Sequence, residues 1–279
     1  MTFISDEADT LFVETSVGTF AYRRFGVEGG VPVLLFHRFR GTIDHWDPAF
    51  LEVLASERDV IVFDNAGIGY SSGESATTMA GMAETAAIFA DAIGLTEVDA
   101  LGWSVGGFVA QHFALLRPEL VRRLLVLGSG PGGENGAPGP EDRVPEVMTR
   151  AVNDDEDYLY LFFGTSDEAR KAGVESLRRL DTRLSKSQLD ITPEAMNAQL
   201  QAIGAWGNDE GSAWERLEDL TLPVLVANGS HDVMVPAQHS FAMSQRLPNA
   251  KTVFYSDAGH AFLFQHPEEF GKVVLDFLK

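Results

Sequence analysis

The chain of 279 residues contains no cysteine. It can therefore form no disulfide, thiolate metal site or cysteine nucleophile, while the redox compartment stays open because a chain without thiols tolerates either one. Positive charge is also scarce, since 21 Lys and Arg face 41 Asp and Glu and leave a formal net charge of −20. That average field would repel phosphate backbones and anionic lipid surfaces, so neither nucleic acid nor a membrane is expected as a partner.

Long apolar runs are missing as well. The stretch VPVLLF at residues 31–36 is typical of the longest ones, and a membrane-spanning helix needs roughly 20 such residues. The first ten residues, MTFISDEADT, are acidic where a signal peptide would be basic and then apolar. We therefore expect a soluble, cytoplasmic protein. Its 45% hydrophobic content, with 27 Gly and 12 Pro, is that of a globular chain with a sizeable core.

Short apolar runs alternate with longer helical patterns over the first 130 residues, which predicts a βαβ organisation. Strands are expected at residues 19–25, 33–37, 60–64, 98–103 and 124–128, and helices at 48–56, 79–93 and 105–117. The pattern returns with strands at 222–228 and 251–255 and helices at 237–246 and 267–278. Most of these strands lack polar alternation, as parallel strands buried on both faces do. The predicted fold class is α/β, with a mostly parallel central sheet flanked by helices.

Residues 131–220 interrupt this alternation with a Pro/Gly-rich start and no convincing buried strand. Thr165 to Glu168 predicts a capping box, and Thr192 followed by Pro193 predicts another helix start. We interpret this segment as a helical lid, inserted into a core domain formed by residues 1–130 and 221–279. It holds 19 acidic and 9 basic residues, so half of the net charge lies in less than a third of the chain.

The most specific motif is Gly102-Trp103-Ser104-Val105-Gly106, placed where a predicted strand ends and a helix begins. A serine on such a turn is forced toward positive φ, and its neighbours two positions away must be small. The hydroxyl then projects above the sheet, and the helix beginning at Val105 directs a free backbone N–H toward the same place. Ser104 is therefore the candidate nucleophile and Val105 a candidate oxyanion donor.

A serine nucleophile needs a histidine base and a carboxylate that orients it. Asp232 follows one predicted strand in the segment NGSHD, and His260 follows the next in SDAGH. Both lie at the sheet edge where ligands bind in open α/β sheets. Asp257, in the same loop as His260, is a rival for the orienting acid, and His231 is expected to be a surface imidazole.

On these motifs, together with the loop Asp64-Asn65-Ala66-Gly67-Ile68-Gly69-Tyr70-Ser71, the chain resembles the α/β-hydrolase fold superfamily, particularly its lid-bearing serine esterase and perhydrolase branches. The resemblance spans nearly the whole chain and implies a catalytic triad of Ser104, His260 and Asp232. Relatives that dehalogenate or open epoxides carry aspartate at the elbow, so Ser104 argues against both activities.

The resemblance also implies a second oxyanion donor in the loop after the strand at 33–37, which makes Phe39 the candidate. This loop reads His37-Arg38-Phe39-Arg40-Gly41, with arginine where the family usually has glycine. Arg38 and Arg40 could pair with nearby Asp44 or Asp47 as ordinary solvated loop charges. Alternatively, their guanidinium groups could bind a carboxylate, enol or polar acyl group of the substrate.

Large aromatic residues could line an apolar pocket between the sheet edge and the lid, although core packing would explain most of them. The candidates for substrate contact are Trp103, Trp46, Trp206 and Phe262, together with Phe39, Phe162 and Phe163.

The sequence thus predicts a serine-dependent hydrolase of a small ester, thioester or lactone that works through an acyl-enzyme, with no cofactor. No metal-ligand motif such as H-E-x-x-H is present. Because the histidine must be neutral to act as a base, activity should fall toward acid pH. Two alternatives stay open: a carbon–carbon bond hydrolase of a diketone-like substrate, and a ligand-binding receptor that retains the triad. A homodimer is also left open.

Overall fold

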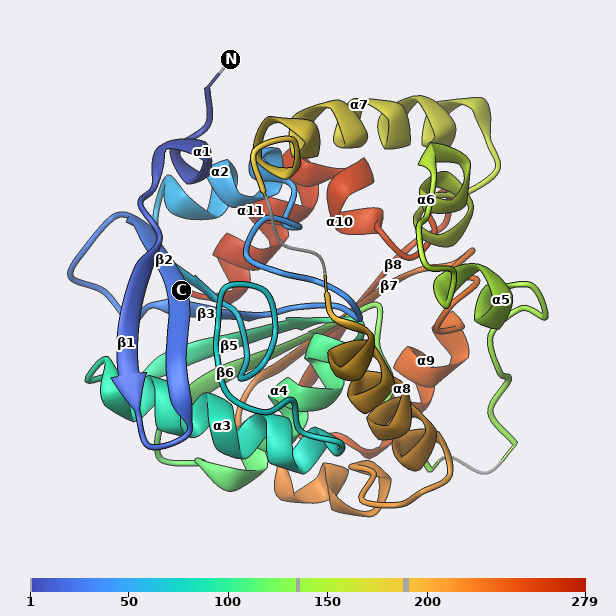
Figure 1. The fold of residues 1–279 in the computed structure, drawn as a ribbon. Helices are drawn as coiled ribbons and strands as arrows, with labels where there is room; N and C mark the ends of the chain where they lie inside the picture. The colour runs from blue at the N-terminus through green and yellow to red at the C-terminus, as the bar shows by residue number, and fades with distance from the viewer. Residues whose placement is uncertain (1, 134–135, 188–190) are drawn as a thin grey trace.

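The computed structural model describes residues 2–133, 136–187 and 191–279, which build one eight-stranded sheet flanked by helices (Figure 1). The strands in spatial order are β1 (Leu11–Thr15), β2 (Gly18–Gly26), β4 (Asp59–Phe63), β3 (Val33–Phe36), β5 (Val98–Trp103), β6 (Val121–Leu127), β7 (Val224–Gly229) and β8 (Ala250–Tyr255). The predicted fold class is confirmed, and the predicted strands agree with these bounds to within a few residues.

The six strands from β4 to β8 in this order pair in parallel, whereas β1 and β2 are antiparallel. All residues of β3, β4, β5 and β7 are buried, which explains their unbroken apolar runs. Strand β1 was not predicted. It lies at the sheet edge with Leu11 and Phe12 exposed, so its sequence carries no sign of a buried face. The parallel pairing brings the carboxyl ends of the strands to a common edge.

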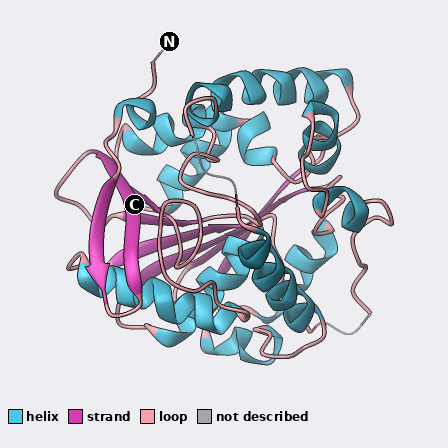
Figure 2. Ribbon diagram, viewed as in Figure 1, coloured by secondary structure: helices cyan, strands magenta, loops and turns pink. Residues whose placement is uncertain are grey.

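Helices cover both faces of the sheet (Figure 2). Their bounds are α1 (Ile4–Glu7), α2 (Pro48–Ala55), α3 (Met79–Ala92), α4 (Val105–Leu116), α9 (Ala237–Arg246), α10 (Phe262–Gln265) and α11 (Pro267–Phe277). Alternate strand residues enter different cores because successive side chains point to opposite faces. Leu34 packs with α3, α4 and α9, whereas Val33 and Leu35 pack with α2 and α11. This double cover fixes the strand ends from which the loops project.

The segment between β6 and β7 is helical, with no strand in the part of residues 131–220 that the structure describes. It contains α5 (Val144–Met148), α6 (Asp155–Phe162), α7 (Asp167–Leu184), α8 (Pro193–Gly207) and a 3₁₀ helix (Trp214–Asp219). Residues 134–135 and 188–190 of the predicted insertion lie outside the described residues.

The helix starts in this segment follow side-chain capping. Thr192 caps α8 by accepting a hydrogen bond from the Ala195 N–H at 3.1 Å, and Pro193 is its first residue, as predicted. The predicted capping box at Thr165 is wrong by one residue. Ser166 caps α7 instead, accepting from the Ala169 N–H at 3.1 Å, because the hydroxyl of the residue directly before the first helical turn is the one that reaches this amide.

Helices α7 and α8 attach to the rest of the molecule in different ways. On α7, Arg179 forms a two-pronged ion pair with the fully buried carboxylate of Asp47, with N–O distances of 2.7 and 2.8 Å, and Ser176 donates to the same carboxylate. On α8, Trp206 stacks on Phe108 of α4 at a centroid distance of 5.1 Å. An ion pair thus attaches α7 to the core, whereas apolar packing attaches α8.

Candidate active site

The loop between β5 and α4 places Ser104 in a strained backbone conformation, with φ at 59° and ψ at −125°. A Cβ atom on Gly102 would collide with the Gly106 carbonyl oxygen, and one on Gly106 would collide with the Phe36 carbonyl oxygen. Only glycine fits at either position, because the strand and helix backbones approach so closely. The predicted sharp turn with small residues on both sides is therefore confirmed. It presents Ser104 at the carboxyl edge of the sheet.

Asp232 and His260, which are far apart in the sequence, meet behind this turn. The His260 Nδ1 lies 2.6 Å from the Asp232 Oδ2, and both side chains are fully buried. The other Asp232 oxygen accepts hydrogen bonds from the Met234 and Val235 N–H groups, each at 2.8 Å. Since the carboxylate accepts, Nδ1 is the donor of this bond, and Nε2 is the atom that presents a lone pair in the neutral ring.

The remaining imidazole nitrogen, Nε2, is buried and makes no hydrogen bond within the part of the chain that the structure describes. The His260 ring is held by Trp103, whose Nε1 donates to the His260 carbonyl oxygen at 3.0 Å, and by Phe162, which stacks on it at 5.8 Å. Ser104 and His260 flank the same strand end, because the Ser104 N–H donates to Leu127 and the next residue, Gly128, packs against the His260 ring. An unbonded, buried acceptor beside a serine is suited to receive a proton.

The rival groups considered from the sequence lie elsewhere. Asp257 is exposed and pairs with His266 at 3.1 Å rather than with His260. His231 is exposed, as expected for a surface imidazole. The geometry thus favours Asp232 as the partner of His260.

Two backbone N–H groups face the region of the serine. Val105 is the first residue of α4 and Phe39 lies in the loop after β3, and both border the same cavity as Ser104. Neither N–H donates a hydrogen bond to any residue in the described ranges. Free amides at a helix start and in a fixed loop can stabilise negative charge that develops on a substrate oxygen.

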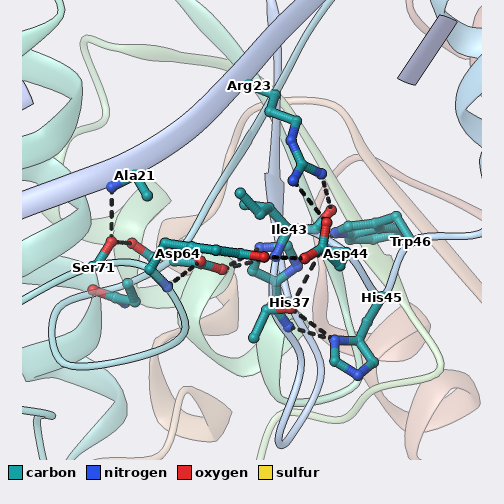
Figure 3. Close-up of polar contacts among 12 residues, drawn as sticks. Ala21, Arg23, His37, Ile43, Asp44, His45, Trp46, Asp64 and Ser71 are labelled. Carbon is teal, nitrogen blue, oxygen red and sulfur yellow. Dashed lines mark hydrogen bonds and ion pairs between the residues drawn. The ribbon is translucent and has the colours of Figure 1, made fainter. Parts of the chain in front are cut away.

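The loop after β3 is held in place by a buried polar network (Figure 3). Arg23 of β2 pairs with Asp44 at 2.7 Å, and Asp64, which follows β4, accepts from the Ile43 N–H at 2.8 Å. The Trp46 Nε1 donates to the His37 Nδ1 at 2.7 Å. Burial lowers the pKa of His37 to about 3, so this imidazole stays neutral and keeps its acceptor. These contacts fix the backbone of the loop between His37 and Trp46.

The two arginines of this loop have different surroundings, and the predicted pairing with Asp44 or Asp47 is wrong. Those carboxylates are taken by Arg23 and Arg179, respectively. The Arg40 guanidinium instead donates to backbone carbonyl oxygens of the segment before α6, at 2.7 Å for Arg150 and 3.1 Å for Ala151. Its side chain therefore tethers that segment, although it also borders the cavity at Ser104.

Arg38 points into that cavity. One guanidinium nitrogen donates to the Phe39 carbonyl oxygen at 2.7 Å, and the group lies over the Phe162 ring at 4.9 Å. Its Nε is buried and makes no hydrogen bond to any described residue. Burial lowers the pKa of Arg38 to about 10, so the side chain remains a cation near neutral pH.

Two cavities meet at Ser104. The larger one, which we call the α7 cavity, has a volume of about 810 Å³ and lies against α6 and α7, with Arg38 and Tyr158 among its lining residues. The smaller one, the α8 cavity, has a volume of about 290 Å³ and is lined mainly by apolar groups, including Phe108, Ile203 and Trp206. Phe39, Ser104, Met148 and Met234 border both.

Of the aromatic residues predicted to contact substrate, some line the cavities and others pack in the core. Trp206 and Phe162 line the α8 and α7 cavities, respectively. Trp46, Trp103 and Phe262, predicted to contact substrate, line neither cavity in the described structure. They are at most 3% exposed and pack in the core on the α2 and α11 side of the sheet, because their rings fill the space beneath the loops rather than above them. Phe163 likewise faces the core.

Sequence reasoning did not single out Tyr158, Met148 or Met234 as lining residues. Met234 lies two residues after Asp232, so its place in the sequence beside the orienting acid could have predicted that it lines the cavity. Tyr158 and Met148 belong to helices whose docking the sequence did not specify. No group of three or more metal-ligating side chains is arranged to hold an ion in the described structure, and none of its helices is both long and apolar enough to span a bilayer.

Comparison with known proteins supports the fold and the class of chemistry. A family model described as the alpha/beta hydrolase fold matches residues 31–267. The pimeloyl-[acyl-carrier protein] methyl ester esterase of Yersinia pseudotuberculosis is 28% identical over 257 residues, covering 90% of this chain and 94% of that enzyme. The acetyltransferase component of the acetoin cleaving system of Cupriavidus necator is 30% identical over 256 residues. That match covers 91% of this chain, which spans 64% of the Cupriavidus protein.

Solved structures agree with this fold. An alpha/beta hydrolase fold protein from Chitinophaga pinensis superposes with a TM-score of 0.88 at 32% identity, over 99% of each chain. The enol-lactonase from Burkholderia xenovorans superposes with a TM-score of 0.77, over 96% of this chain and 99% of that one. Its sequence is 20% identical, so it supports the architecture alone.

Proposed function

The chain belongs to the α/β hydrolase fold family, and on this premise we propose that it hydrolyses a small carboxylic ester, thioester or lactone through an acyl-enzyme at Ser104. The observation that carries the proposal is the His260 imidazole, which is bonded through Nδ1 to Asp232 at 2.6 Å and keeps Nε2 buried and unbonded among the described residues. The esterase names of several relatives agree with this class of reaction.

In the first half of the reaction, the Ser104 hydroxyl oxygen attacks the substrate carbonyl carbon while the His260 Nε2 takes the hydroxyl proton. Asp232 holds the ring and stabilises its cationic form. The carbonyl oxygen becomes an oxyanion, which accepts hydrogen bonds from the Val105 and Phe39 N–H groups. The tetrahedral intermediate then collapses, the bond to the leaving group breaks, and His260 returns its proton to the departing oxygen or sulfur.

In the second half, a water molecule replaces the leaving group. His260 removes a proton from this water, the resulting hydroxide attacks the acyl carbon, and the proton passes to the Ser104 oxygen as the acid departs. The helical segment at 131–220 acts as the lid of this site, since α6 and α7 border the α7 cavity and α8 borders the α8 cavity.

The test is the intact mass of the protein after incubation with a fluorophosphonate probe. The wild type should gain one adduct, whereas Ser104→Ala and His260→Ala should gain none. Ser16→Ala, which removes an exposed hydroxyl in the turn between β1 and β2, is the matched control and should label like the wild type. Labelling that persists in Ser104→Ala would contradict the proposal.

A carbon–carbon bond hydrolase is the second candidate, because the cationic Arg38, which has no carboxylate partner among the described residues, would also suit an enolate. A panel containing both esters and β-diketones separates the two functions. Rapid ester turnover supports the esterase, whereas slow ester turnover with tight, saturable diketone cleavage supports the alternative. Tight binding without turnover, unchanged in Ser104→Ala, would instead indicate a receptor.

A further inference from the structure

Arg38 differs from Arg23, Arg40 and Arg179 in what its guanidinium contacts, whereas Arg178, which also lines the α7 cavity, is exposed. Arg23 and Arg179 each contact a buried carboxylate at 2.7 Å, and Arg40 is satisfied by backbone carbonyl oxygens. Within the described ranges, Arg38 has no carboxylate at ion-pair distance, and its Nε has no acceptor. Arg38 is half-buried, and a partly desolvated cation without a compensating anion reduces the stability of the fold.

Apart from the Arg40 cation, the groups around the Arg38 guanidinium are neutral. It lies 4.9 Å from the centroid of Phe162 and 6.0 Å from that of Trp103, which also flank the His260 ring. Burial raises the pKa of the nearby Tyr158 to about 12, so this phenol supplies no negative charge near neutral pH. The aromatic faces hold the guanidinium in one orientation but leave its charge unneutralised.

The carboxylates of the α7 cavity lie at its mouth. Asp154, Asp155 and Asp181 line it but are exposed, whereas Arg38 and Ser104 lie deeper. The floor is therefore locally cationic although the whole chain is strongly acidic. An anionic substrate group that reached this floor would meet a preoriented, half-buried guanidinium, which binds a carboxylate with charge-assisted hydrogen bonds.

We infer that Arg38 is a specificity-determining residue, and that the preferred substrates are esters carrying a carboxylate, which Arg38 binds in the α7 cavity while the scissile carbonyl lies at Ser104. This inference rests on the proposed function, which it deepens by naming the substrate class. The apolar α8 cavity then takes the uncharged group on the other side of the scissile bond.

The test compares two pairs of esters that differ in one negative charge. In one pair the acyl group varies, 4-nitrophenyl hydrogen adipate against 4-nitrophenyl methyl adipate. In the other pair the leaving group varies, 4-carboxyphenyl butyrate against phenyl butyrate. The wild type should prefer the anionic member of one pair. Arg38→Gln should lower kcat/KM for that ester by about ten- to a hundredfold, mainly through KM, and change its neutral partner by less than about threefold.

Two variants separate charge recognition from loop structure. Arg38→Lys keeps the charge and should retain part of the preference for the anionic ester. Arg117→Gln removes a guanidinium that lines neither cavity, so it should leave the ratio of anionic to neutral rates unchanged. Equal losses on both members of each pair in Arg38→Gln, or a wild-type preference for the neutral esters, would overturn the inference.

A binding measurement makes the outcome independent of catalysis. In the Ser104→Ala background, calorimetric titration with monomethyl adipate should show binding that Arg38→Gln weakens at least about tenfold. If the wild type hydrolyses none of the four esters but this binding holds, the proposed function fails and the anion site stands. If esters are hydrolysed but binding is insensitive to Arg38, the anion site fails and the function stands.

Discussion

The two helices that enclose Ser104 are fastened to the core by different kinds of contact. Helix α7 is held by the ion pair between Arg179 and the buried Asp47, whereas α8 is held by the stacking of Trp206 on Phe108. The cavities beside them differ in the same way, since the α7 cavity contains charged and polar groups and the α8 cavity is mainly apolar. On the proposed function, we therefore expect the two sides of the bond that is cleaved to meet different chemistry, and the substrate to be asymmetric.

The largest effect should follow from breaking the attachment of α7. Arg179→Ala leaves the Asp47 carboxylate buried without its counter-ion, which should lower the free energy of unfolding by about 3–5 kcal/mol. Urea unfolding followed by circular dichroism measures this change. Arg170→Ala is the control, because its partner Glu156 and Arg170 itself are more than half exposed, and this variant should lose less than about 1 kcal/mol. Similar losses in both variants would show that the buried pair does not anchor α7.

The difference between the α7 and α8 cavities can be tested by enlarging each cavity in turn. Trp206→Leu enlarges the α8 cavity and Leu177→Ala enlarges the α7 cavity. Two ester series are assayed, one with acyl chains of increasing length and one with alcohol chains of increasing length. Trp206→Leu should move the optimum to longer chains in one series and Leu177→Ala in the other, by about fourfold in kcat/KM per added methylene. If both variants shift the same series, the two cavities do not hold opposite sides of the bond.

A smaller effect should appear in the loop that separates the two cavities. Burial lowers the pKa of His37 to about 3, below the ordinary histidine value. The neutral His37 imidazole contributes fully to the free energy of unfolding above the pKa of histidine in the unfolded chain. This contribution is lost as the pH falls below that pKa, because unfolding then takes up a proton. Between pH 7 and pH 5 the loss should be about 2 kcal/mol.

Chemical unfolding of the wild type and of His37→Gln at both pH values isolates this contribution. Burial raises the pKa of Asp64 to about 7, which acts in the opposite direction. The Asp64 carboxyl lies 3.8 Å from the His37 Nε2, and glutamine keeps a neutral side chain at this position, so both proteins share this contribution. The wild type should lose about 2 kcal/mol more than the variant on acidification. Equal pH dependence in the two proteins would mean that His37 is not the group responsible.

The sequence predicted those site residues whose position follows from chain order. Ser104 and Asp232 each follow a buried strand and His260 follows the edge strand β8. Because parallel strands bring their carboxyl ends together, the approach of Asp232 to His260 could be expected. The positive φ of Ser104 followed from the two small neighbours. Strand β1 escaped prediction because an exposed edge strand lacks a buried face.

The remaining features depend on packing between distant segments. Arg38 and Arg40 are the same residue type two positions apart, yet carbonyl oxygens of residues 150 and 151 satisfy one while the other lies against aromatic rings. Likewise, Trp206 lines a cavity while Trp46 and Trp103 fill the core. The residues next to these arginines and tryptophans in the sequence do not determine their different surroundings. Those surroundings depend on where the helices of the inserted segment dock.

The acidic surface of the inserted segment has a kinetic consequence for the substrate class inferred above. Residues 131–220 carry a net charge of −10, counting 19 acidic and 9 basic residues, and they border the entrance through which an anionic ester must diffuse. Long-range repulsion slows such encounters, and salt weakens it because the Debye length is only about 8 Å at physiological ionic strength. Capture of a charged ester should therefore quicken as salt is added, up to the concentration at which the guanidinium of Arg38 is itself screened, while capture of a neutral ester stays constant.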